Sequence, residues 1–329
     1  MGARSQHSFI GQIYRENSRI LQNQFSLCLG EKETKSKNYA GVFTIGGLDA
    51  RLHKSYMAFA QETGARNFYE VYVENVYLRT NRYSNTVREG VDITRVDLDP
   101  IDLNARGVTL RSEIPYTYLT SSISKAFRRA WRDAVGVDYM KAPLTLSPSQ
   151  LYTLPTILFQ FRGLSRIDYN SNLDPYNMSG FAGSIDPTSP YDVIVAMPPM
   201  QYMEYNEGST TSTFTSRLYL DAPEGSVLGQ NFMQHHNVFF DLDRHLVGFA
   251  ESHCLYTSLE GKALIVNEMA LFGVETSHQS IKTGTMEPEE THITTYSQHV
   301  VVVPLAIGCS ILYSVIIWKF LSVIRRPSS

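Results

Sequence analysis

The sequence has almost no excess of charge and no basic run in the body of the chain. Its 29 Lys and Arg residues nearly balance 32 Asp and Glu residues, which leaves a net charge of -3. A nucleic-acid-binding surface needs clustered basic side chains, so we expect no nucleic-acid partner. Internal repeats and low-complexity blocks are also missing, so nothing indicates a repeat architecture.

Cysteine is scarce, with only Cys28, Cys254 and Cys309 present. Three cysteines are too few for a disulfide-rich framework. Because Cys309 lies inside an apolar run near the C-terminus, two cysteines remain for the rest of the chain. A single disulfide is the simplest interpretation, and three buried free thiols are the alternative that a reducing compartment would favour.

The first residues contain no apolar segment of the kind that a secretory signal peptide needs. Gln6 also excludes the N-myristoylation pattern. At the other end, residues 300–318 form a run of 19 residues without a charge. This run is long enough to cross a bilayer as a helix, although a buried core helix is the alternative.

The charges that flank this apolar run indicate its orientation. Arg325 and Arg326 follow it, whereas acidic residues precede it. The positive-inside rule therefore predicts a single-pass membrane protein with a cytosolic C-terminus and a lumenal or extracellular body. Since the body must then be translocated, either the last helix directs insertion after synthesis or the true N-terminus lies upstream of Met1, and we expect the second.

Aromatic and β-branched residues are abundant, with 20 Tyr and 16 Phe, which favours a sheet protein. The patterning predicts an all-β sandwich or barrel. We expect strands at 24–30, 42–45, 68–78, 107–110, 154–161, 192–197, 213–220, 227–228 and 237–240, a hairpin from the first two, and another within 81–99. One helix is predicted over 121–135, with a serine cap and an apolar face formed by Ile123, Phe127, Ala130, Trp131 and Ala134.

Several polar groups are more simply explained by structure or solvation than by chemistry. We expect exposed histidines without a metal site at His235, His236, His245 and His253. A solvated acidic face is expected at Asp97, Asp99 and Asp102, and the wet face of the helix at Lys125, Arg128, Arg129 and Arg132. The loop 168–190 carries the glycosylation candidate Asn177. The Tyr-rich stretch 197–205 either lines a peptide groove or packs in the interior.

Five segments carry a resemblance to a known family. They read QFSLCLG (24–30), GVFTIGG (41–47), FYEVYVENVYL (68–78), LPTILFQFRG (154–163) and SVLGQNFMQHHNVFFDLDRHLVGFAESHC (226–254). In this order, and over most of residues 1–254, they resemble the C-terminal lobe of the pepsin-like aspartic proteases of peptidase family A1. The resemblance implies the fold of one lobe of a bilobal acid protease, with no cofactor and no metal.

The resemblance also assigns structural roles to particular residues. Membrane-anchored members of the family pair the two cysteines that correspond to Cys28 and Cys254, which implies a disulfide here. The apolar pair and glycine that cross beneath the family's active-site loop correspond to Val227, Leu228 and Gly229. We therefore expect these three residues to form the active-site scaffold.

The catalytic position itself is degenerate. Family members use two aspartates, one from each lobe, in Asp-Thr/Ser-Gly turns, and the two carboxylates share one proton. This chain contains no such tripeptide; Arg111, Ser112 and Glu113 stand where the second one is expected. An Arg side chain cannot act as a base, and the neighbouring register is expected to point Glu113 elsewhere. By the same resemblance, the first lobe would lie upstream of Met1.

These observations predict a pepsin-like lobe at 1–255, a stalk at 256–299, a transmembrane helix at 300–324 and a cytosolic tail at 325–329. The expected function is that of a membrane-anchored, inactive homologue of aspartic endopeptidases. A non-catalytic module that binds a peptide or protein is the alternative, and a partner covering the face of the missing lobe is compatible with either. Activity by assembly with a second chain is disfavoured by Arg111.

Overall fold

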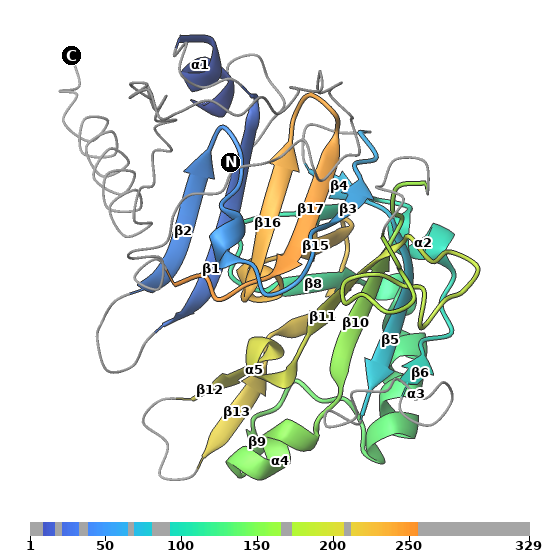
Figure 1. Ribbon diagram of the computed structural model, residues 1–329. Helices are drawn as coiled ribbons and strands as arrows, with labels where there is room; N and C mark the ends of the chain where they lie inside the picture. Colours follow the sequence, from blue (N-terminus) through green and yellow to red (C-terminus); the bar gives the residue numbers. More distant parts are fainter. Residues whose placement is uncertain are drawn as a thin grey trace, which may run out of the picture.

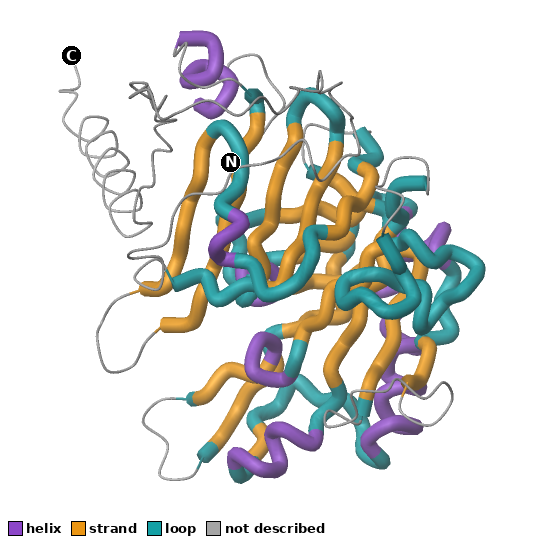
Figure 2. The backbone as a smooth tube through the Cα atoms, in the orientation of Figure 1, coloured by secondary structure: helices purple, strands orange, loops and turns teal. Residues whose placement is uncertain are grey.

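The structure is a computed structural model, and it describes residues 9–16, 22–32, 39–64, 69–80, 93–165, 173–206 and 212–255. Strands make up most of its regular structure, and the helices are short (Figures 1 and 2). The chain is therefore a mostly-β protein, as the strand patterning predicts. Within the described residues the strands are divided among four sheets, instead of closing into one barrel.

The first sheet joins the two ends of the described chain, because strands from both ends pair within it. Its order is β2-β1-β16-β17-β3, and all neighbours are antiparallel. The strands are β1 (Gln24–Lys32), β2 (Tyr39–Ile45), β3 (Ala58–Gln61), β16 (His236–Asp241) and β17 (Leu246–Glu251). The hairpin predicted from the first two strands is confirmed.

A disulfide closes this sheet at one side. Cys28 in β1 bonds to Cys254, which follows β17, and their Cα atoms are 5.0 Å apart. Both cysteines are fully buried, and they pack with Val42 and Leu52 in a small apolar cluster separate from the main core. This is the pair that the family resemblance implies.

The second and third sheets are smaller. The second has the order β11-β10-β5-β6, with β5 (Val73–Arg79), β6 (Ile93–Arg95), β10 (Thr156–Phe161) and β11 (Val193–Met197). Of the second predicted hairpin, within 81–99, the structure describes one strand, β6, which pairs with β5 outside that range, and residues 81–92 lie outside the described residues. The third sheet has the order β12-β13-β9, with β9 (Leu144–Thr145), β12 (Met203–Tyr205) and β13 (Thr213–Ser216).

The fourth sheet contains strands that run in both directions. Its order is β14-β8-β15-β7-β4, with β4 (Glu70–Val71), β7 (Val108–Leu110), β8 (Thr117–Thr120), β14 (Leu218–Ala222) and β15 (Ser226–Leu228). The strand β15 lies between β7 and β8, although β7 and β8 are neighbours along the chain. It runs parallel to β7 and antiparallel to β8.

Two predicted strands are interrupted, which corrects the sequence interpretation. The segment 68–78 divides at Tyr72 into β4 and β5, and the segment 213–220 divides at Arg217 into β13 and β14. In both cases the two parts belong to different sheets, so a bend in the chain redirects an otherwise continuous strand pattern. The strands β3 and β17 were not predicted, because both are mostly buried on both faces and lack the alternation of a half-exposed strand.

The helices also differ from the prediction of a single one. The described residues form six α-helices, namely α1 (Phe9–Glu16), α2 (Pro100–Asn104), α3 (Ser124–Val135), α4 (Pro148–Thr153), α5 (Pro199–Tyr202) and α6 (Gln230–Met233). The expected serine cap of the predicted helix is wrong. A 3-10 turn, Ser121–Ile123, precedes α3, and the capping position is Ile123, which makes no side-chain capping bond.

The face of α3 that was predicted to be apolar does pack inward, through Phe127, Ala130 and Trp131. Of the cations assigned to its wet face, Arg128 is an exception. It is half-buried, and it donates a hydrogen bond of 2.6 Å to the carbonyl oxygen of Tyr139. The helix ends at Gly136, whose φ of 81° favours a residue without a side chain.

A contiguous core of aromatic side chains connects the sheets. Phe161 on β10 stacks on Phe249 on β17 with ring centroids 5.4 Å apart, and Phe232 of α6 meets Phe159 edge-on at 5.3 Å. Phe232 also meets Phe249 edge-on at 6.2 Å, so α6, which directly follows β15, packs against both sheets. The core therefore sets the position of the segment that supports the candidate site.

No helix among the described residues has the length and apolar character needed to cross a bilayer. The predicted span at 300–324, the stalk at 256–299 and the tail at 325–329 lie outside the described residues.

Candidate functional site

The turn from Arg111 to Tyr116 connects β7 to β8, which are two internal strands of the fourth sheet. The strand β15 fills the space between β7 and β8, with Val227 opposite Thr109 on one side and opposite Tyr118 on the other. The structure therefore brings the predicted turn and the predicted scaffold together (Figure 1). Residues more than 100 positions apart in the chain become direct neighbours here.

The turn is held by backbone hydrogen bonds to β15 and α6. The N–H of Arg111 donates to the carbonyl of Leu228 at 3.0 Å, and the N–H of Gln230 donates to the carbonyl of Ile114 at 2.8 Å. The side-chain amide of Gln230 also donates to the carbonyl of Ser112 at 2.6 Å. Because three carbonyl and N–H groups of the turn have partners on one segment, its conformation is set by that segment.

Gly229 stands where the scaffold passes closest to the turn. A Cβ atom at this position would lie 2.2 Å from the carbonyl oxygen of Tyr116 and 2.7 Å from that of Ile114. Both are backbone atoms that cannot move aside without shifting the turn. Only glycine therefore permits this close approach.

A buried hydrogen-bond network completes the support. The hydroxyl of Thr117 donates to Asn231 Oδ1 at 2.7 Å, and the amide of Asn231 donates to the carbonyl of Arg217 at 3.1 Å. Thr117 is fully buried and Asn231 nearly so. Buried polar groups that all have partners make a segment rigid, so the turn rests on a fixed base.

The side chains at the tip of the turn form an ion pair with each other. Arg111 Nη2 and Nε both lie 2.6 Å from Glu113 Oε1, and the two side chains are 34% and 40% exposed. Burial alone would raise the pKa of Glu113, but the backbone N–H and the Arg111 guanidinium outweigh it and leave the pKa below its ordinary value. Glu113 is thus an ionised carboxylate at neutral pH.

This arrangement cannot perform general acid–base catalysis of the kind that two carboxylates perform together. The turn contains one carboxylate, and a cation occupies the adjacent position. A guanidinium neither accepts a proton nor shares one with a carboxylate at ordinary pH. Ser226 is buried and accepts a hydrogen bond from the Thr120 N–H.

A surface of tyrosines and charged groups adjoins the turn. The guanidinium of Arg217 lies 4.9 Å from the ring centroid of Tyr116 and forms an ion pair with Glu204. Tyr118 and Tyr219 stack with their ring centroids 4.8 Å apart. All three tyrosines are half-buried, so each presents part of its ring to solvent. We call these five residues the tyrosine surface.

The histidines do not all behave as predicted. His245 and His253 are exposed, but His236 is buried on β16 and makes a hydrogen bond through Nδ1, so the expectation of exposure is wrong there. The physical reason is that β16 is enclosed on both faces. Among the described residues, no group of three or more His, Cys, Asp or Glu side chains is placed to hold a metal ion.

The remaining candidates lie on the surface. Asn177 is exposed in a loop, and its amide donates to Asp174 at 2.6 Å. The acidic group Asp97, Asp99 and Asp102 is exposed, and Asp99 caps α2 by accepting from the N–H of Ile101. The Tyr-rich stretch 197–205 divides: Tyr202 is fully buried, whereas Tyr205 is exposed.

Sequence reasoning missed the polar residues that support the turn, above all Gln230, Asn231 and Thr117. They have no motif of their own, because their role depends on contacts between distant segments. The glycine after Val227 and Leu228 was the only local signal, and it did mark the point of close approach. No family model matches the chain, and no curated protein matches it either.

Proposed function

We propose that this chain is a non-proteolytic, membrane-anchored homologue of the pepsin-like aspartic proteases, and that it corresponds to their C-terminal lobe. The observation that carries this proposal is the ion pair of Arg111 with Glu113 in a turn supported by Val227, Leu228 and Gly229. The resemblance expects a catalytic aspartate in that turn and a glycine-containing crossing beneath it. The crossing geometry supports the resemblance, and the ion pair supports the absence of catalysis.

The test of inactivity is a cleavage assay with the purified full chain. Peptide libraries and denatured proteins are incubated with it between about pH 3 and pH 7, where carboxylate dyads operate. We expect no cleavage above that of a matched Arg111→Ala variant. Cleavage that is lost in that variant, or blocked by a transition-state-type aspartic protease inhibitor, would refute the proposal.

A non-catalytic binding module is the second candidate, and the tyrosine surface favours it. Tyrosine and arginine are the residue types that most often dominate binding energy at protein interfaces. Here Tyr116, Tyr118 and Tyr219 lie with Arg217 next to the turn where the resemblance expects bound peptide. A partner that covers the face of the missing lobe would meet the same surface.

Binding is tested by panning the full chain against a library of extended peptides. We expect Tyr219→Ala and Arg217→Ala to weaken the selected peptides about tenfold or more, which is the usual effect at an interface hot spot. Lys125→Ala, an exposed change on α3, serves as the control. Equal binding by all four proteins would exclude the tyrosine surface as the site.

Membrane anchoring and a lumenal or extracellular body are part of the proposal. They rest on the apolar run 300–318 and on Arg325 and Arg326. Asn177 reports on the topology, because it is exposed and lies in a glycosylation sequon. In cells, glycosidase treatment should increase the gel mobility of the wild-type chain but not that of Asn177→Gln. An unmodified wild-type chain in the cytosolic fraction would contradict this part.

A further inference from the structure

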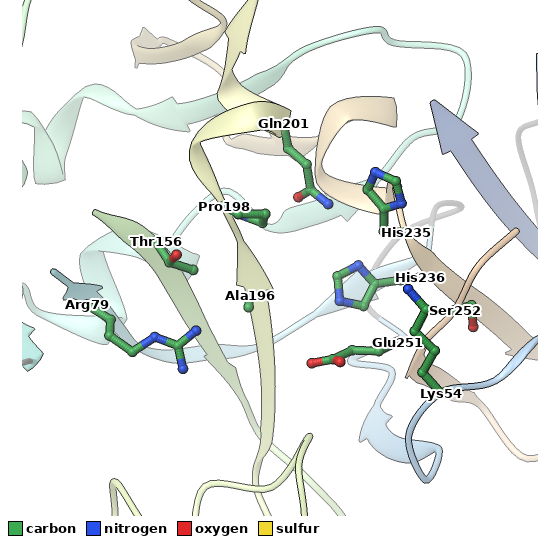
Figure 3. Close-up of a pocket in the computed structure, with 10 residues that line it drawn as sticks. All are labelled: Lys54, Arg79, Thr156, Ala196, Pro198, Gln201, His235, His236, Glu251 and Ser252. Carbon is green, nitrogen blue, oxygen red and sulfur yellow. The ribbon is translucent and has the colours of Figure 1, made fainter. Parts of the chain in front are cut away.

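A hollow lies between the first and second sheets, and none of its lining residues belongs to the Arg111 turn. It is a cavity of about 330 Å³, a size typical of small-molecule sites. Its walls come from the ends of β5, β10 and β11 on one side and of β16 and β17 on the other (Figure 3). The α5 helix contributes Gln201.

The two walls carry opposite hydrogen-bonding character. Arg79 and Thr156 are register partners on β5 and β10, and their guanidinium and hydroxyl can donate. His236 and Glu251 are register partners on β16 and β17, and they supply acceptors. Figure 3 shows the Arg79 guanidinium and the Glu251 carboxylate extending into the space from opposite sides. Strand pairing therefore fixes both halves of this arrangement.

The acceptor character of His236 follows from its hydrogen bond. Its Nδ1 lies 3.0 Å from the carbonyl oxygen of Gln234, which can only accept, so Nδ1 carries the proton. In the neutral ring Nε2 then has a free lone pair. Burial lowers the pKa of His236, with Glu251 and the bond to Gln234 acting in the opposite sense, so the ring stays neutral at neutral pH.

Gln201 holds the same backbone carbonyl that His236 contacts. Its amide nitrogen donates to the same carbonyl of Gln234 at 2.6 Å, which fixes the orientation of the amide. The side-chain oxygen is then left buried without a hydrogen-bond donor, on a residue that is only 5% exposed. That oxygen is closed off from the cavity, so the contribution of Gln201 to the site is its hydrogen bond to the Gln234 carbonyl.

We propose that this cavity binds a small zwitterion of the α-amino-acid type. The ammonium group donates to the Glu251 carboxylate and to His236 Nε2. The carboxylate accepts from Arg79 and from the Thr156 hydroxyl. A purely anionic ligand brings no donor for His236 Nε2, and a purely cationic one faces the Arg79 guanidinium, so a ligand with both charges matches both walls.

Lys54 stands at the side of Glu251 and adds a second cation to the lining. We assign it no direct contact with the ligand.

Equilibrium dialysis of the full chain with a radiolabelled mixture of the common L-amino acids tests the proposal. We expect saturable retention of at least one of them at one site per chain. Its methyl ester, which lacks the carboxylate, and its N-acetyl derivative, which lacks the ammonium, should each bind about tenfold more weakly or worse, as expected for the loss of a charge-assisted contact.

Variants connect this binding to the cavity. Glu251→Gln and Thr156→Val should each weaken it about tenfold, because each removes one partner of a charged ligand group. Glu224→Gln removes an exposed carboxylate outside the lining and should bind like the wild type. Thermal unfolding of each variant verifies folding, and Glu251 is exposed enough for its variant to fold.

Three outcomes would overturn the proposal. The first is that the folded wild-type chain retains no amino acid. The second is that the Glu251→Gln variant retains as much amino acid as the wild type. The third is that the N-acetyl derivative binds the wild type as tightly as the free amino acid does. The last of these would identify an anion site instead of a site for a zwitterion. Because none of these measurements involves proteolysis or the tyrosine surface, their failure leaves the proposed function untouched.

Discussion

Arg111 and Glu113, two residues apart in one turn, contact each other through a guanidinium and a carboxylate at 2.6 Å. Their charges cancel at the tip of the turn. The backbone of this turn is hydrogen-bonded to β15 and α6. The backbone frame and the side chains at the tip are thus physically separate features. The first depends on buried hydrogen bonds, and the second on an exposed ion pair.

The first prediction follows from this separation. Replacing Arg111 by Gln, or Glu113 by Gln, should lower the free energy of unfolding by less than about 1 kcal/mol, because half-exposed ion pairs are screened by solvent. Chemical denaturation of each variant measures the change.

A matched change below the turn should cost more. Thr117→Val keeps the shape of the side chain but leaves Asn231 Oδ1 without its donor. We expect a loss of roughly 1–3 kcal/mol, the usual cost of an unsatisfied buried acceptor. If the Arg111 variant is the more destabilised of the two, then the ion pair and not the buried network holds the turn.

The second prediction concerns the close approach at Gly229. Gly229→Ala should destabilise the fold by roughly 3 kcal/mol, because the new methyl group overlaps the Tyr116 carbonyl oxygen. Gly136→Ala is the control: nothing lies within 4 Å of its Cβ position, and only the backbone conformation is unfavourable, at about 1 kcal/mol. Thermal unfolding should give the lower melting temperature for Gly229→Ala. Equal melting temperatures would show that the backbone of the turn shifts to accommodate the methyl group.

The third prediction concerns the disulfide. The bond between Cys28 and Cys254 spans a sequence separation of 226, so it restricts a very long loop in the unfolded chain. In the chain-entropy account, replacing both cysteines by Ala lowers stability by up to roughly 5 kcal/mol. A reductant should lower the melting temperature of the wild-type chain and leave that of the double variant unchanged. No effect of the reductant on the wild type would contradict the pairing.

The fourth prediction is a pH dependence that originates at His53. Burial lowers its pKa from 6.5 to about 4, which the nearby Asp49 carboxylate only partly opposes. His53 Nε2 accepts a bond from the Asn237 amide at 3.0 Å, and a proton on this nitrogen would break that bond. Between pH 6.5 and 4 the unfolded chain therefore binds a proton that the folded chain does not.

The sign follows from that difference in proton binding. The contribution of His53 to stability is complete above about pH 6.5 and is lost as the pH falls to about 4, by roughly 3 kcal/mol in total. His53→Gln should flatten this part of the stability profile, measured by denaturant unfolding at a series of pH values. An unchanged slope in the variant would assign the effect to other groups, such as His236.

The strand pattern was readable from the sequence for runs such as β1 and β2 that are bounded by turn residues, whereas the short strand β8 was missed although its side chains alternate in burial. The pairing of β1 with β2 and the helix α3 follow from period-two and period-3.6 patterns that are local. The strands β3 and β17 were missed, and two others were not seen to divide, because burial on both faces and assignment to a sheet depend on distant neighbours.

The absence of an Asp-Thr/Ser-Gly tripeptide and the presence of Arg111 two residues before Glu113 are facts of the sequence alone. Only the tertiary structure pairs Arg111 with Glu113, places Gly229 against the Tyr116 carbonyl, and sets Thr156 and Glu251 in the lining of one cavity. The physical reason is that these contacts join residues that are far apart in the sequence. Residue type and spacing determine local chemistry and local conformation, whereas the register between strands far apart in the chain decides which side chains meet.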